Sequence, residues 1–490
     1  MTFTPTPEQS AIVDFVTSSS QNLLISALAG AAKTSTLVLI AEALPNTQIT
    51  AISFNKRIAE EMKKRLPPNC ESMTLNSLGF RTWTANLGQR AKVDSGKIYR
   101  LVKEAIEHQD EDLQKYLWDR FTILMSVLEE GKTRGWLPDD YRPPIRGNAL
   151  PTPLLDDEEF FSTTEEELLP AEQLLISELM RRSCDEALGL AGPMVLDFSD
   201  QLFMPTLWPV SWSSPPVVLI DEAQDLSPLN HVMLKKFARR RLIAVGDECQ
   251  SIYGFRGADQ HSMANLETTF AMERMTLTVS FRCPIAIVEA ALWRAPTMKW
   301  GPNAKPGSIA TLASWDASTI PDDGVILCRN NAPLFSTAIK LLRNGRHPEL
   351  VGSDIGKTLV KWLRKLGPEK MTQAEALAAL ADWTAKKLEK SRVPAKVHDQ
   401  AACLEVFIRQ GRTLSDAIAY AEKVLSLGGP VKLMTVHKSK GLEFDDVYLL
   451  DEDLIDRDAP QERNLRYVAI TRSKSTLTYI YSEGFINGDD

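Results

Sequence analysis

The sequence predicts an α/β protein with two parallel-sheet cores, each interrupted by a helical insertion. Short apolar runs recur along the chain, and each is followed by a segment with helical periodicity. This alternation is typical of parallel sheets that are covered by helices on both faces. The expected strands are residues 23–26, 50–54, 217–220, 242–245, 325–328, 433–436 and 447–450.

Stretches without such apolar runs define the expected domain boundaries. Residues 96–130 and 165–190 are helical in period and rich in charge, and residues 354–428 carry Ala and Leu at helical spacing. A Pro-rich, acidic segment that ends at 156–159 indicates an exposed loop between the first two stretches. The expected division is a first core at 1–85 and 186–275 with an insertion at 86–185, and a second core at 276–353 and 430–490 with an insertion at 354–429.

The bulk composition limits the classes of protein to which the chain can belong. A chain of 490 residues is too long for one core and suggests roughly two to four domains. The net charge of −8 gives no global attraction to nucleic acid, so any polyanion must bind in a local basic groove. The six cysteines form no Cys-x-x-Cys pair, which argues against a zinc ribbon, an iron–sulfur cluster or a disulfide scaffold. Without a signal peptide or a spanning apolar run, we expect a cytoplasmic protein.

A candidate phosphate-binding loop follows the first expected strand. Small residues at 27–32 lead into Lys33 and Thr34, where a helix is expected to begin. In that setting, backbone N–H groups would hold phosphate oxygens, Lys33 would neutralise them, and Thr34 would hold Mg²⁺. Ala32 stands where such loops normally carry glycine, which avoids a clash with phosphate and permits a positive φ. A small-residue strand-to-helix turn is the alternative interpretation of this segment alone.

A second Gly-Lys-Thr sequence, at residues 131–133, follows a charged helical stretch and no strand. A phosphate loop needs a strand before it and a helix after it, so we expect this match to have arisen by chance.

An acidic pair follows the expected strand 217–220. Asp221 would bind Mg²⁺, and Glu222 would orient and deprotonate an attacking water. The alternative is a carboxylate pair that caps a helix. After the next expected strand, Gln250 is placed to touch a γ-phosphate, and Tyr253 and Phe255 follow on a turn. Aromatic rings on an exposed loop suit base stacking, although such rings are more often part of a core.

The order of these motifs resembles the superfamily 1 DNA helicases of the UvrD/Rep/PcrA type. The resemblance extends from about residue 5 to residue 480. Each motif is weak alone, but their order over the whole length is not accidental. The matching segments are residues 6–9, 27–34, 52–56, 74–79, 197–200, 280–284, 435–444 and 462–473.

The resemblance implies two RecA-like cores that use ATP and Mg²⁺ to move along single-stranded DNA, 3′→5′, and to act at single-strand/duplex junctions. Closure of the cores would bring arginines of the second core to the γ-phosphate. The implied catalytic residues are Lys33, Asp221, Glu222, Gln250, Arg282 and Arg472, and the metal would be held by Thr34 and Asp221. The implied ATP-binding residues are Gln9, Ala29, Gly30, Ala31, Ala32, Lys33, Thr34, Ser35, Phe281 and Glu443. The implied DNA-binding residues are Phe54, Asn55, Lys56, Asn76, Tyr253, Phe255, Arg256 and His437.

Several positions depart from the family pattern. Ser35 replaces an arginine that commonly contacts adenine, Asn76 replaces a histidine, and Phe281 replaces a tyrosine. The insertion at 354–429 is shorter than usual, so duplex unwinding is less secure than translocation, and the compact size suggests a phage or mobile-element enzyme. A basic cluster there is either a duplex contact or a solvated helix face: Lys386, Lys387, Lys390, Arg392 and Lys396.

Two other functions remain open alongside a translocase and helicase. One is a DNA-stimulated translocase that remodels protein–DNA complexes without processive unwinding. The other is a degenerate ATP-binding regulatory module, inactivated at Ala32. Retention of the other implied catalytic residues argues against the degenerate module.

Overall fold

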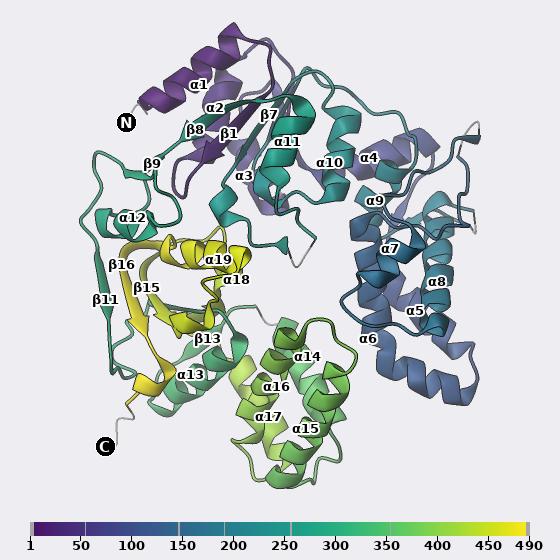
Figure 1. The fold of residues 1–490 in the computed structure, drawn as a ribbon, viewed down its shortest axis with the longest axis vertical. Coiled ribbons are helices and arrows are strands. Elements are labelled where there is room, and N and C mark those ends of the chain that lie inside the picture. Colours follow the sequence, from purple (N-terminus) through teal and green to yellow (C-terminus); the bar gives the residue numbers. More distant parts are fainter. Residues whose placement is uncertain are drawn as a thin grey trace. The chain divides into compact units, whose positions relative to one another are not determined.

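The computed structural model describes residues 4–53, 55–145, 148–190, 192–254, 257–352 and 354–486, without the side chains of residues 354, 355 and 357. The chain divides into two compact units (Figure 1). The first unit comprises Met1–Ala27 and Ala32–Leu277. The second unit comprises Leu28–Ala31 and Thr278–Asp490.

The first unit is built on a six-stranded sheet in which every strand is parallel to its neighbours. The strand order is β3-β2-β6-β7-β1-β8. Its central strands β6 and β7 carry no polar side chain and are buried, and Leu24 of β1 lies opposite Ala244 of β7. The bounds are β1 (Leu23–Ala27), β2 (Ile49–Ser53), β3 (Cys70–Thr74), β6 (Val217–Ile220), β7 (Leu242–Gly246) and β8 (Glu273–Leu277).

Seven helices surround this sheet or extend from it. In a parallel sheet the carboxyl ends of the strands share one edge, where ligands of open α/β sheets bind. The candidate loop follows β1, the acidic pair follows β6, and Asp247 follows β7, so the topology brings all three to this edge. The helices are α1 (Pro7–Ser18), α2 (Lys33–Ala43), α3 (Lys56–Arg65), α4 (Leu75–Leu87), α9 (Asp200–Leu207), α10 (Pro228–Phe237) and α11 (Ser262–Phe270).

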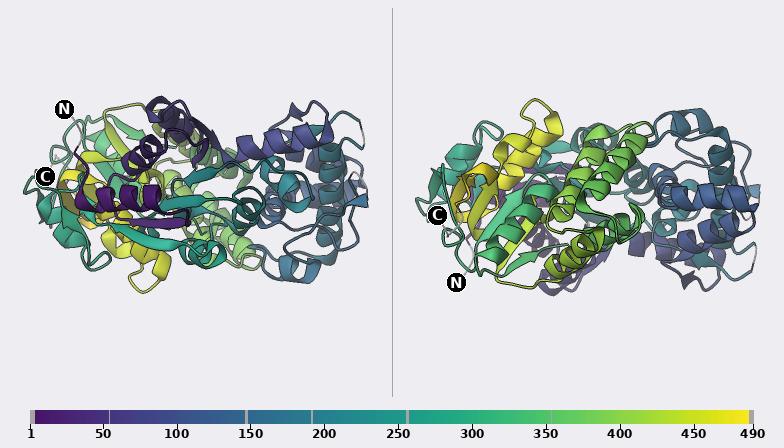
Figure 2. Two further views of the ribbon diagram at one scale, coloured as in Figure 1. Left: turned by 90° about the horizontal axis from the view of Figure 1, so that it is seen from above. Right: turned by 90° about the horizontal axis from the view of Figure 1, so that it is seen from below.

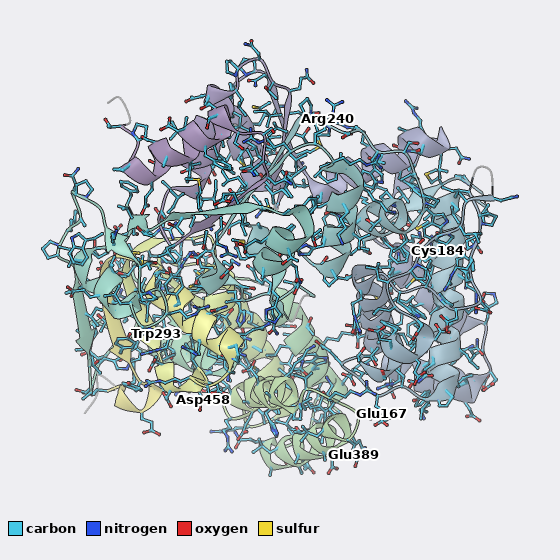
Figure 3. The ribbon with its side chains drawn as sticks, turned by 45° about the horizontal axis from the view of Figure 1, so that its top comes forward. Glu167, Cys184, Arg240, Trp293, Glu389 and Asp458 are labelled. Carbon is cyan, nitrogen blue, oxygen red and sulfur yellow. The ribbon has the colours of Figure 1, made fainter. Side chains whose placement is uncertain are left out.

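A helical segment lies between α4 and α9 in the same unit. Its long helices α5 (Lys97–Glu107), α6 (Glu111–Arg134) and α8 (Pro170–Leu188) pack against one another (Figure 2). Cys184 of α8 belongs to their core (Figure 3). A short parallel pair, β4 (Lys92–Val93) and β5 (Val195–Leu196), joins the two ends of the segment.

The sequence analysis expects the acidic residues 156–159 to lie in an exposed loop, and this expectation is wrong for residues 157–159. They begin a short helix, α7 (Asp157–Ser162), because the Asp156 side chain accepts a hydrogen bond from the backbone N–H of Glu159. Acidic residues in the first helical turn are also favoured by the helix dipole. The same physical property that suggested an exposed segment therefore stabilises a helix N-terminus here.

The second unit carries another six-stranded parallel sheet, in the order β11-β16-β15-β12-β14-β13. The bounds are β11 (Ser308–Thr311), β12 (Val325–Cys328), β13 (Pro348–Leu350), β14 (Val431–Thr435), β15 (Phe444–Leu450) and β16 (Ser473–Ile480). The two remaining strands, β9 (Val279–Ser280) and β10 (Lys299–Trp300), form a small parallel pair. The helices are α12 (Ile285–Ala291), α13 (Asn331–Arg343), α14 (Asp354–Lys365), α15 (Gln373–Leu388), α16 (Pro394–Ile408), α17 (Leu414–Leu425), α18 (Val436–Ser439) and α19 (Pro460–Ile470).

The predicted fold class is confirmed: both units contain a parallel sheet, and each predicted strand is present within a few residues. The strands that the sequence analysis missed carry polar residues. Edge strands β3, β8 and β11 are partly or fully exposed, and β16 begins with four polar residues. Exposed edges need no continuous apolar run, and so they lack that signal. Among the described residues, none of the helices combines the length and apolar character needed to cross a membrane.

Candidate nucleotide and nucleic-acid sites

The candidate phosphate loop has the backbone conformation that glycine favours. Gly30 has φ of 74°, and Ala32, which immediately precedes α2, has φ of 56° and ψ of 41°. An L-residue in this left-handed region costs about 1 kcal/mol relative to glycine, because Cβ crowds the following carbonyl. The loop therefore keeps its left-handed turn at Ala32 despite the additional methyl group.

The first residues of α2 contact the acidic pair that follows β6. The Nζ atom of Lys33 donates a hydrogen bond to Glu222 Oε2 at 2.9 Å, and the two side chains are largely buried. The Thr34 hydroxyl donates to Asp221 Oδ2 at 3.2 Å. The structure thus brings together four residues that the sequence analysis assigned to one site, from two segments 187 to 189 positions apart.

Burial and charge shift the ionisation of this group. Burial lowers the pKa of Lys33, but the neighbouring carboxylates outweigh burial, and its pKa is raised overall. Burial, followed by repulsion from Glu222, raises the pKa of Asp221 to about 6 despite the attraction of Lys33. Burial also raises the pKa of Asp247. A divalent cation would relieve this concentration of negative charge.

Glu222 itself lies in a left-handed backbone conformation, with φ of 55°. It begins a tight 3₁₀ turn at Ala223–Asp225, and its backbone N–H donates to Asp221 Oδ1 at 2.9 Å. Non-glycine residues held in this conformation are often found where function determines the backbone path.

Gln224 joins the acidic pair to the segment that follows β7. Its Nε2 donates to Glu222 Oε2 at 2.5 Å, and its Oε1 accepts from the backbone N–H of Asp247 at 2.9 Å. Asp247 Oδ2 in turn accepts from Gln250 Nε2 at 2.6 Å. The sequence analysis assigned no role to Gln224 or Asp247, although Asp247 directly follows β7 and Gln224 lies just after the acidic pair that follows β6. The hydrogen bonds from Glu222 through Gln224 and Asp247 to Gln250 connect the carboxyl ends of two neighbouring strands, β6 and β7.

The predicted adenine-reading Gln9 is buried and forms local hydrogen bonds. Its Oε1 accepts from the backbone N–H of Thr6, and its Nε2 donates to the Thr36 hydroxyl at 3.0 Å. Beside it, the guanidinium of Arg65 donates to the Ser35 hydroxyl at 2.9 Å. Arg65 was not predicted, because it lies at the end of α3 and 30 residues from Ser35.

In the second unit, Arg282 and Glu443 form an ion pair with 2.6 Å between Nε and Oε2. Phe281 beside it is 49% exposed, so its ring is accessible for stacking. A cavity of about 220 Å³ adjoins Phe281 and Arg282 and is also lined by Lys305 and Lys474. The structure thus brings together three predicted nucleotide-contacting residues of this unit.

Arg472, the second predicted arginine finger, is buried inside the second unit. Its Nε donates to the carbonyl of Val468 at 3.0 Å, and its Nη1 donates to that of Leu442 at 2.9 Å. In this arrangement the guanidinium connects α19 to the segment that precedes β15. Contact with a phosphate would require Arg472 to exchange some of these hydrogen bonds.

Three predicted DNA-binding residues of the first unit, Asn55, Lys56 and Asn76, follow the carboxyl ends of β2 and β3, and Tyr253 follows β7. Lys56 is exposed, and Asn55 caps α3 by accepting from the backbone N–H of Ile58. Asn76 donates to the carbonyl of Phe198 at 2.8 Å. Tyr253 is half-buried, and so is His437 in the second unit. Three predicted residues, Phe54, Phe255 and Arg256, lie outside the described residues.

Phe198 is an aromatic residue that the sequence analysis quoted without assigning it a role. Its side chain is 68% exposed, which is unusual for phenylalanine, and its carbonyl is held by Asn76. A Phe between two aspartates was the available signal. Its exposure depends on tertiary structure and could not be read from the local pattern.

One member of the basic cluster, which the sequence analysis left open as a duplex contact or a solvated helix face, makes contacts within the helical segment. Lys387 Nζ lies 4.8 Å from the centre of the Trp362 ring and 4.5 Å from that of Trp383. It also donates to Gln400 Oε1 at 3.0 Å. These cation–π contacts indicate that Lys387 joins α14, α15 and α16 to one another.

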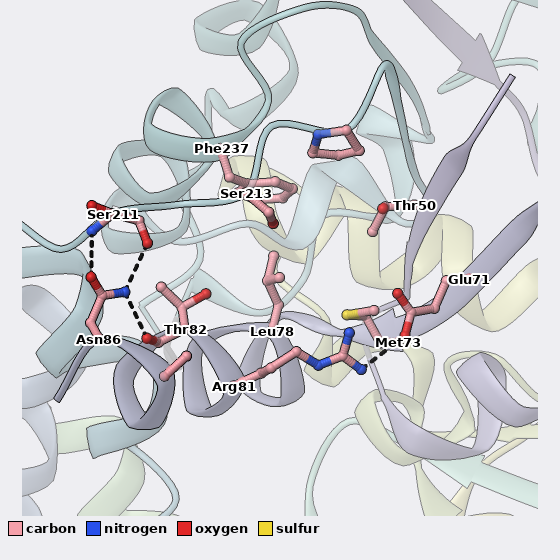
Figure 4. A pocket seen from close by; sticks show the side chains of 12 residues that line it. Thr50, Glu71, Met73, Leu78, Arg81, Thr82, Asn86, Ser211, Ser213 and Phe237 are labelled. Atoms are coloured by element: carbon pink, nitrogen blue, oxygen red, sulfur yellow. Dashed lines mark hydrogen bonds and ion pairs between the residues drawn. The ribbon is translucent and has the colours of Figure 1, made fainter. Parts of the chain in front are cut away.

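A different cavity lies near the amino ends of β2 and β3 and has a volume of about 180 Å³ (Figure 4). At its mouth Arg81 pairs with Glu71, and Asn86 is hydrogen-bonded to Ser211 and Thr82. It shares no residue with the predicted ATP or DNA sites.

Comparison with known proteins agrees with this arrangement. The model of the UvrD/REP helicase N-terminal domain matches residues 6–271, which is more than half of the chain. The chain belongs to the UvrD/REP helicase family. The model of the UvrD-like helicase C-terminal domain also matches residues 430–480. The predicted resemblance is therefore confirmed.

Individual relatives are distant. The chain is 24% identical over 515 residues to the F-box DNA helicase protein 1 of Schizosaccharomyces pombe, a match that covers 96% of the chain and 57% of that protein. It is 26% identical over 547 residues to the F-box DNA helicase 1 of Gallus gallus, a match that covers 96% of the chain and 48% of that protein. It is 26% identical over 296 residues to the probable DNA helicase II homolog of Rickettsia felis, a match that covers 55% of the chain and 41% of that protein. The chain spans about half the length of these curated relatives.

Proposed function

We propose that this protein is an ATP-dependent DNA translocase and helicase that moves 3′→5′ along single-stranded DNA. The observation that carries the proposal is the meeting of Lys33 and Thr34 with Asp221 and Glu222 at the carboxyl edge of the first sheet. Phosphoryl transfer needs a cation for the phosphates, oxygen ligands for Mg²⁺ and a group that activates water. Lys33 lies within hydrogen-bonding distance of Glu222, and Thr34 lies within hydrogen-bonding distance of Asp221.

The oxygen atoms of Thr34 and Asp221 suit Mg²⁺, which prefers a hydroxyl and a carboxylate to nitrogen or sulfur ligands. Bound Mg²⁺ would neutralise charge on the phosphates of ATP. Lys33 would bind the β- and γ-phosphates once it leaves Glu222. Glu222 would then accept a proton from water, with Gln224 holding its carboxylate in position.

The second unit would contribute positive charge and stacking. Phe281 and Arg282 border one cavity, which supports a role for the ring on the adenine base and for the guanidinium on a phosphate. Glu443 would accept from the ribose hydroxyl, and Arg472 would supply a further cation. In the first unit, Arg65 beside Ser35 would supply the cation that Ser35 lacks.

The strand would lie over the carboxyl ends of β2 and β3 and be held without sequence preference. The polar and basic groups proposed there are Asn55, Lys56 and Asn76, with Tyr253 and Phe198 as stacking surfaces. Phe54, Phe255 and Arg256 are proposed from the family resemblance alone. Stacking and phosphate contact tolerate every base, because each base presents a flat face.

The decisive experiment combines hydrolysis with strand displacement. ATPase activity is measured with and without oligo(dT), and unwinding is measured on duplexes with a 3′ tail or a 5′ tail. We expect DNA-stimulated hydrolysis and displacement from the 3′-tailed duplex only. The enzyme proposal would be contradicted if DNA did not stimulate hydrolysis by wild type and if Glu222→Gln hydrolysed ATP as fast as wild type.

Translocation without processive unwinding is the second candidate function. The helical segment of the second unit is limited to α14–α17, and at least one of its basic residues, Lys387, is engaged within the segment. DNA-stimulated hydrolysis and displacement of a protein from single-stranded DNA, without duplex unwinding, would favour this candidate.

A further inference from the structure

Two lysines of the first helical segment are completely buried and face two buried aspartates. Lys97 lies on α5 and Lys132 on α6, and both are 0% exposed. Lys97 Nζ lies 2.7 Å from Asp200 Oδ2, and Lys132 Nζ lies 2.7 Å from Asp200 Oδ1. Lys132 also pairs with Asp197. The Gly-Lys-Thr sequence at 131–133 is thus part of a helix, as expected for a chance match, but its lysine is engaged in this cluster.

The cluster balances its charges, two positive and two negative. Burial lowers the pKa of Lys132, but the two aspartates outweigh burial and raise it overall. Burial raises the pKa of Asp200, but the two lysines outweigh burial and lower it overall. Lys132 and Asp200 are therefore both charged at neutral pH. Lys97 also donates to the backbone carbonyls of Ser183 and Val195, at 2.6 and 3.0 Å.

A buried ionic cluster of this kind fixes the positions of its residues more than it stabilises the fold. Moving charges out of water has a large cost, and apolar residues of similar size often stabilise a core equally well. What the ionic cluster adds is direction, because each hydrogen bond requires its partner at one place. The partners here are on α5, on α6 and in the turn that leads into the first residue of α9.

That turn, residues 197–200, is closed by reciprocal hydrogen bonds. Asp197 Oδ1 accepts from the backbone N–H of Asp200 at 2.8 Å and from the Ser199 hydroxyl at 3.0 Å. Asp200 Oδ2 accepts from the backbone N–H of Asp197 at 2.9 Å. Phe198, inside the turn, is left 68% exposed.

The turn also lies against α4. A Cβ atom added at Gly79 would lie 1.9 Å from the carbonyl oxygen of Gln201, so only glycine permits this approach of α4 to α9. Asn76, one turn earlier on α4, donates to the carbonyl of Phe198. The ring is therefore exposed on a backbone that is held from both sides.

We propose that Lys97 and Lys132 are positioning residues, which fix the turn at 197–200 and thereby present the Phe198 ring to a base of single-stranded DNA. This inference rests on the proposed DNA-binding function. The helical segment then acts on strand binding through two buried lysines that never touch the strand.

The test measures the Kd of full-length protein for fluorescein-labelled oligo(dT), together with ATPase activity without DNA and the thermal unfolding midpoint. Phe198→Ala is expected to raise Kd about tenfold, the usual effect of removing one stacking ring. Lys132→Met/Asp197→Asn removes one charge of each sign and leaves the Lys97–Asp200 pair intact. It is expected to raise Kd about as much as Phe198→Ala, and less than twofold further when combined with it.

Lys115→Met is the matched control, because Lys115 is an exposed lysine of the same helix. It should leave Kd unchanged. Ser199→Ala removes the hydroxyl that lies 3.0 Å from Asp197 Oδ1 and 2.7 Å from Glu129 Oε2 and keeps every buried charge, so it serves if the double variant does not fold. It is expected to raise Kd two- to threefold without changing ATPase activity in the absence of DNA.

Wild-type Kd in both Lys132→Met/Asp197→Asn and Ser199→Ala would overturn the inference. The inference would also be overturned if the effects of Lys132→Met/Asp197→Asn and Phe198→Ala on Kd were fully multiplicative in the combined variant. Failure of wild-type protein to bind oligo(dT) would instead contradict the proposed function. The two failures are therefore distinguishable.

Discussion

Lys33 Nζ and Glu222 Oε2 lie 2.9 Å apart, so the lysine predicted to meet a phosphate is paired with the carboxylate predicted to activate water. A phosphate that binds Lys33 must compete with Glu222 for the same ammonium group. Glu222 Oε2 would still accept a hydrogen bond from Gln224 after that exchange. In the proposed mechanism, the ion pair therefore links nucleotide binding to release of the Glu222 carboxylate.

Glu222→Gln should separate binding from hydrolysis. The amide cannot take a proton from water, so we expect kcat to fall by about 10²–10⁴-fold. The Kd for ATP should stay equal or decrease, because Lys33 loses its competing anion. Steady-state ATPase assays and equilibrium binding of a fluorescent ATP analogue measure the two effects. Glu42→Gln, an exposed position on α2, is the control, and an unchanged kcat in Glu222→Gln would contradict the assigned role.

Ala32→Gly should stabilise the protein and leave activity within about tenfold. Glycine removes the left-handed strain at this position, worth about 1 kcal/mol, although part of the gain is lost to the greater freedom of the unfolded chain. Ala41→Gly places the same substitution within α2 and should destabilise by about 1 kcal/mol or more. Urea unfolding of both variants measures the difference. If Ala32→Gly and Ala41→Gly change the free energy of unfolding in the same direction, the conformation of Ala32 is not strained. A large gain of activity in Ala32→Gly would support the degenerate regulatory module.

Gln224→Ala should lower kcat about tenfold and change the KM for ATP little. The substitution removes the donor to Glu222 and the acceptor for the Asp247 N–H, and a buried polar group left unpaired is costly. Gln224→Glu should be worse than alanine, since a second carboxylate repels Glu222. If the glutamate variant hydrolyses ATP as fast as wild type, the hydrogen bond to Glu222 has no catalytic consequence.

Arg65→Ala should raise the KM for ATP about three- to tenfold at unchanged kcat, the effect of losing one charged hydrogen bond at an exposed site. Arg65 reaches Ser35 at the start of α2, where the nucleotide is proposed to bind. Lys64→Ala, at the neighbouring exposed position of α3, should behave as wild type. Equal KM values for the two variants would remove Arg65 from the proposed nucleotide site.

Acid stability should depend on the buried cluster. The pKa of Asp200 is lower in the folded protein than its ordinary value of 3.8, so its stabilising effect is complete above about pH 4 and is lost as pH falls further. Wild type should therefore lose up to about 1.4 kcal/mol per pH unit more than Lys97→Met/Asp200→Asn below pH 4. Urea unfolding at pH 5, 4 and 3 measures the slopes, and parallel slopes would contradict the lowered pKa.

Features with a local signal could be predicted from the sequence alone. A buried central strand must be continuously apolar, so β1, β6, β7 and β12 were predicted nearly residue for residue. Lys33, Thr34, Asp221 and Glu222 were recognisable because loop chemistry and strand ends impose short motifs. The family followed from the order of those motifs, and it is confirmed. The roles of Arg282, Arg472 and the DNA-binding residues, the direction of movement and a phage source stay predictions.

The packing of the folded chain determines which distant groups meet. Lys132 belongs to a misleading Gly-Lys-Thr sequence, yet it pairs with Asp197, 65 residues away. Arg65 reaches Ser35, and Gln224 joins two strand ends, although neither pairing leaves a mark on the local sequence. The physical reason is that apolar periodicity reports burial of a segment against any partner. A hydrogen bond or ion pair depends instead on the relative placement of two particular residues, and only packing determines that placement.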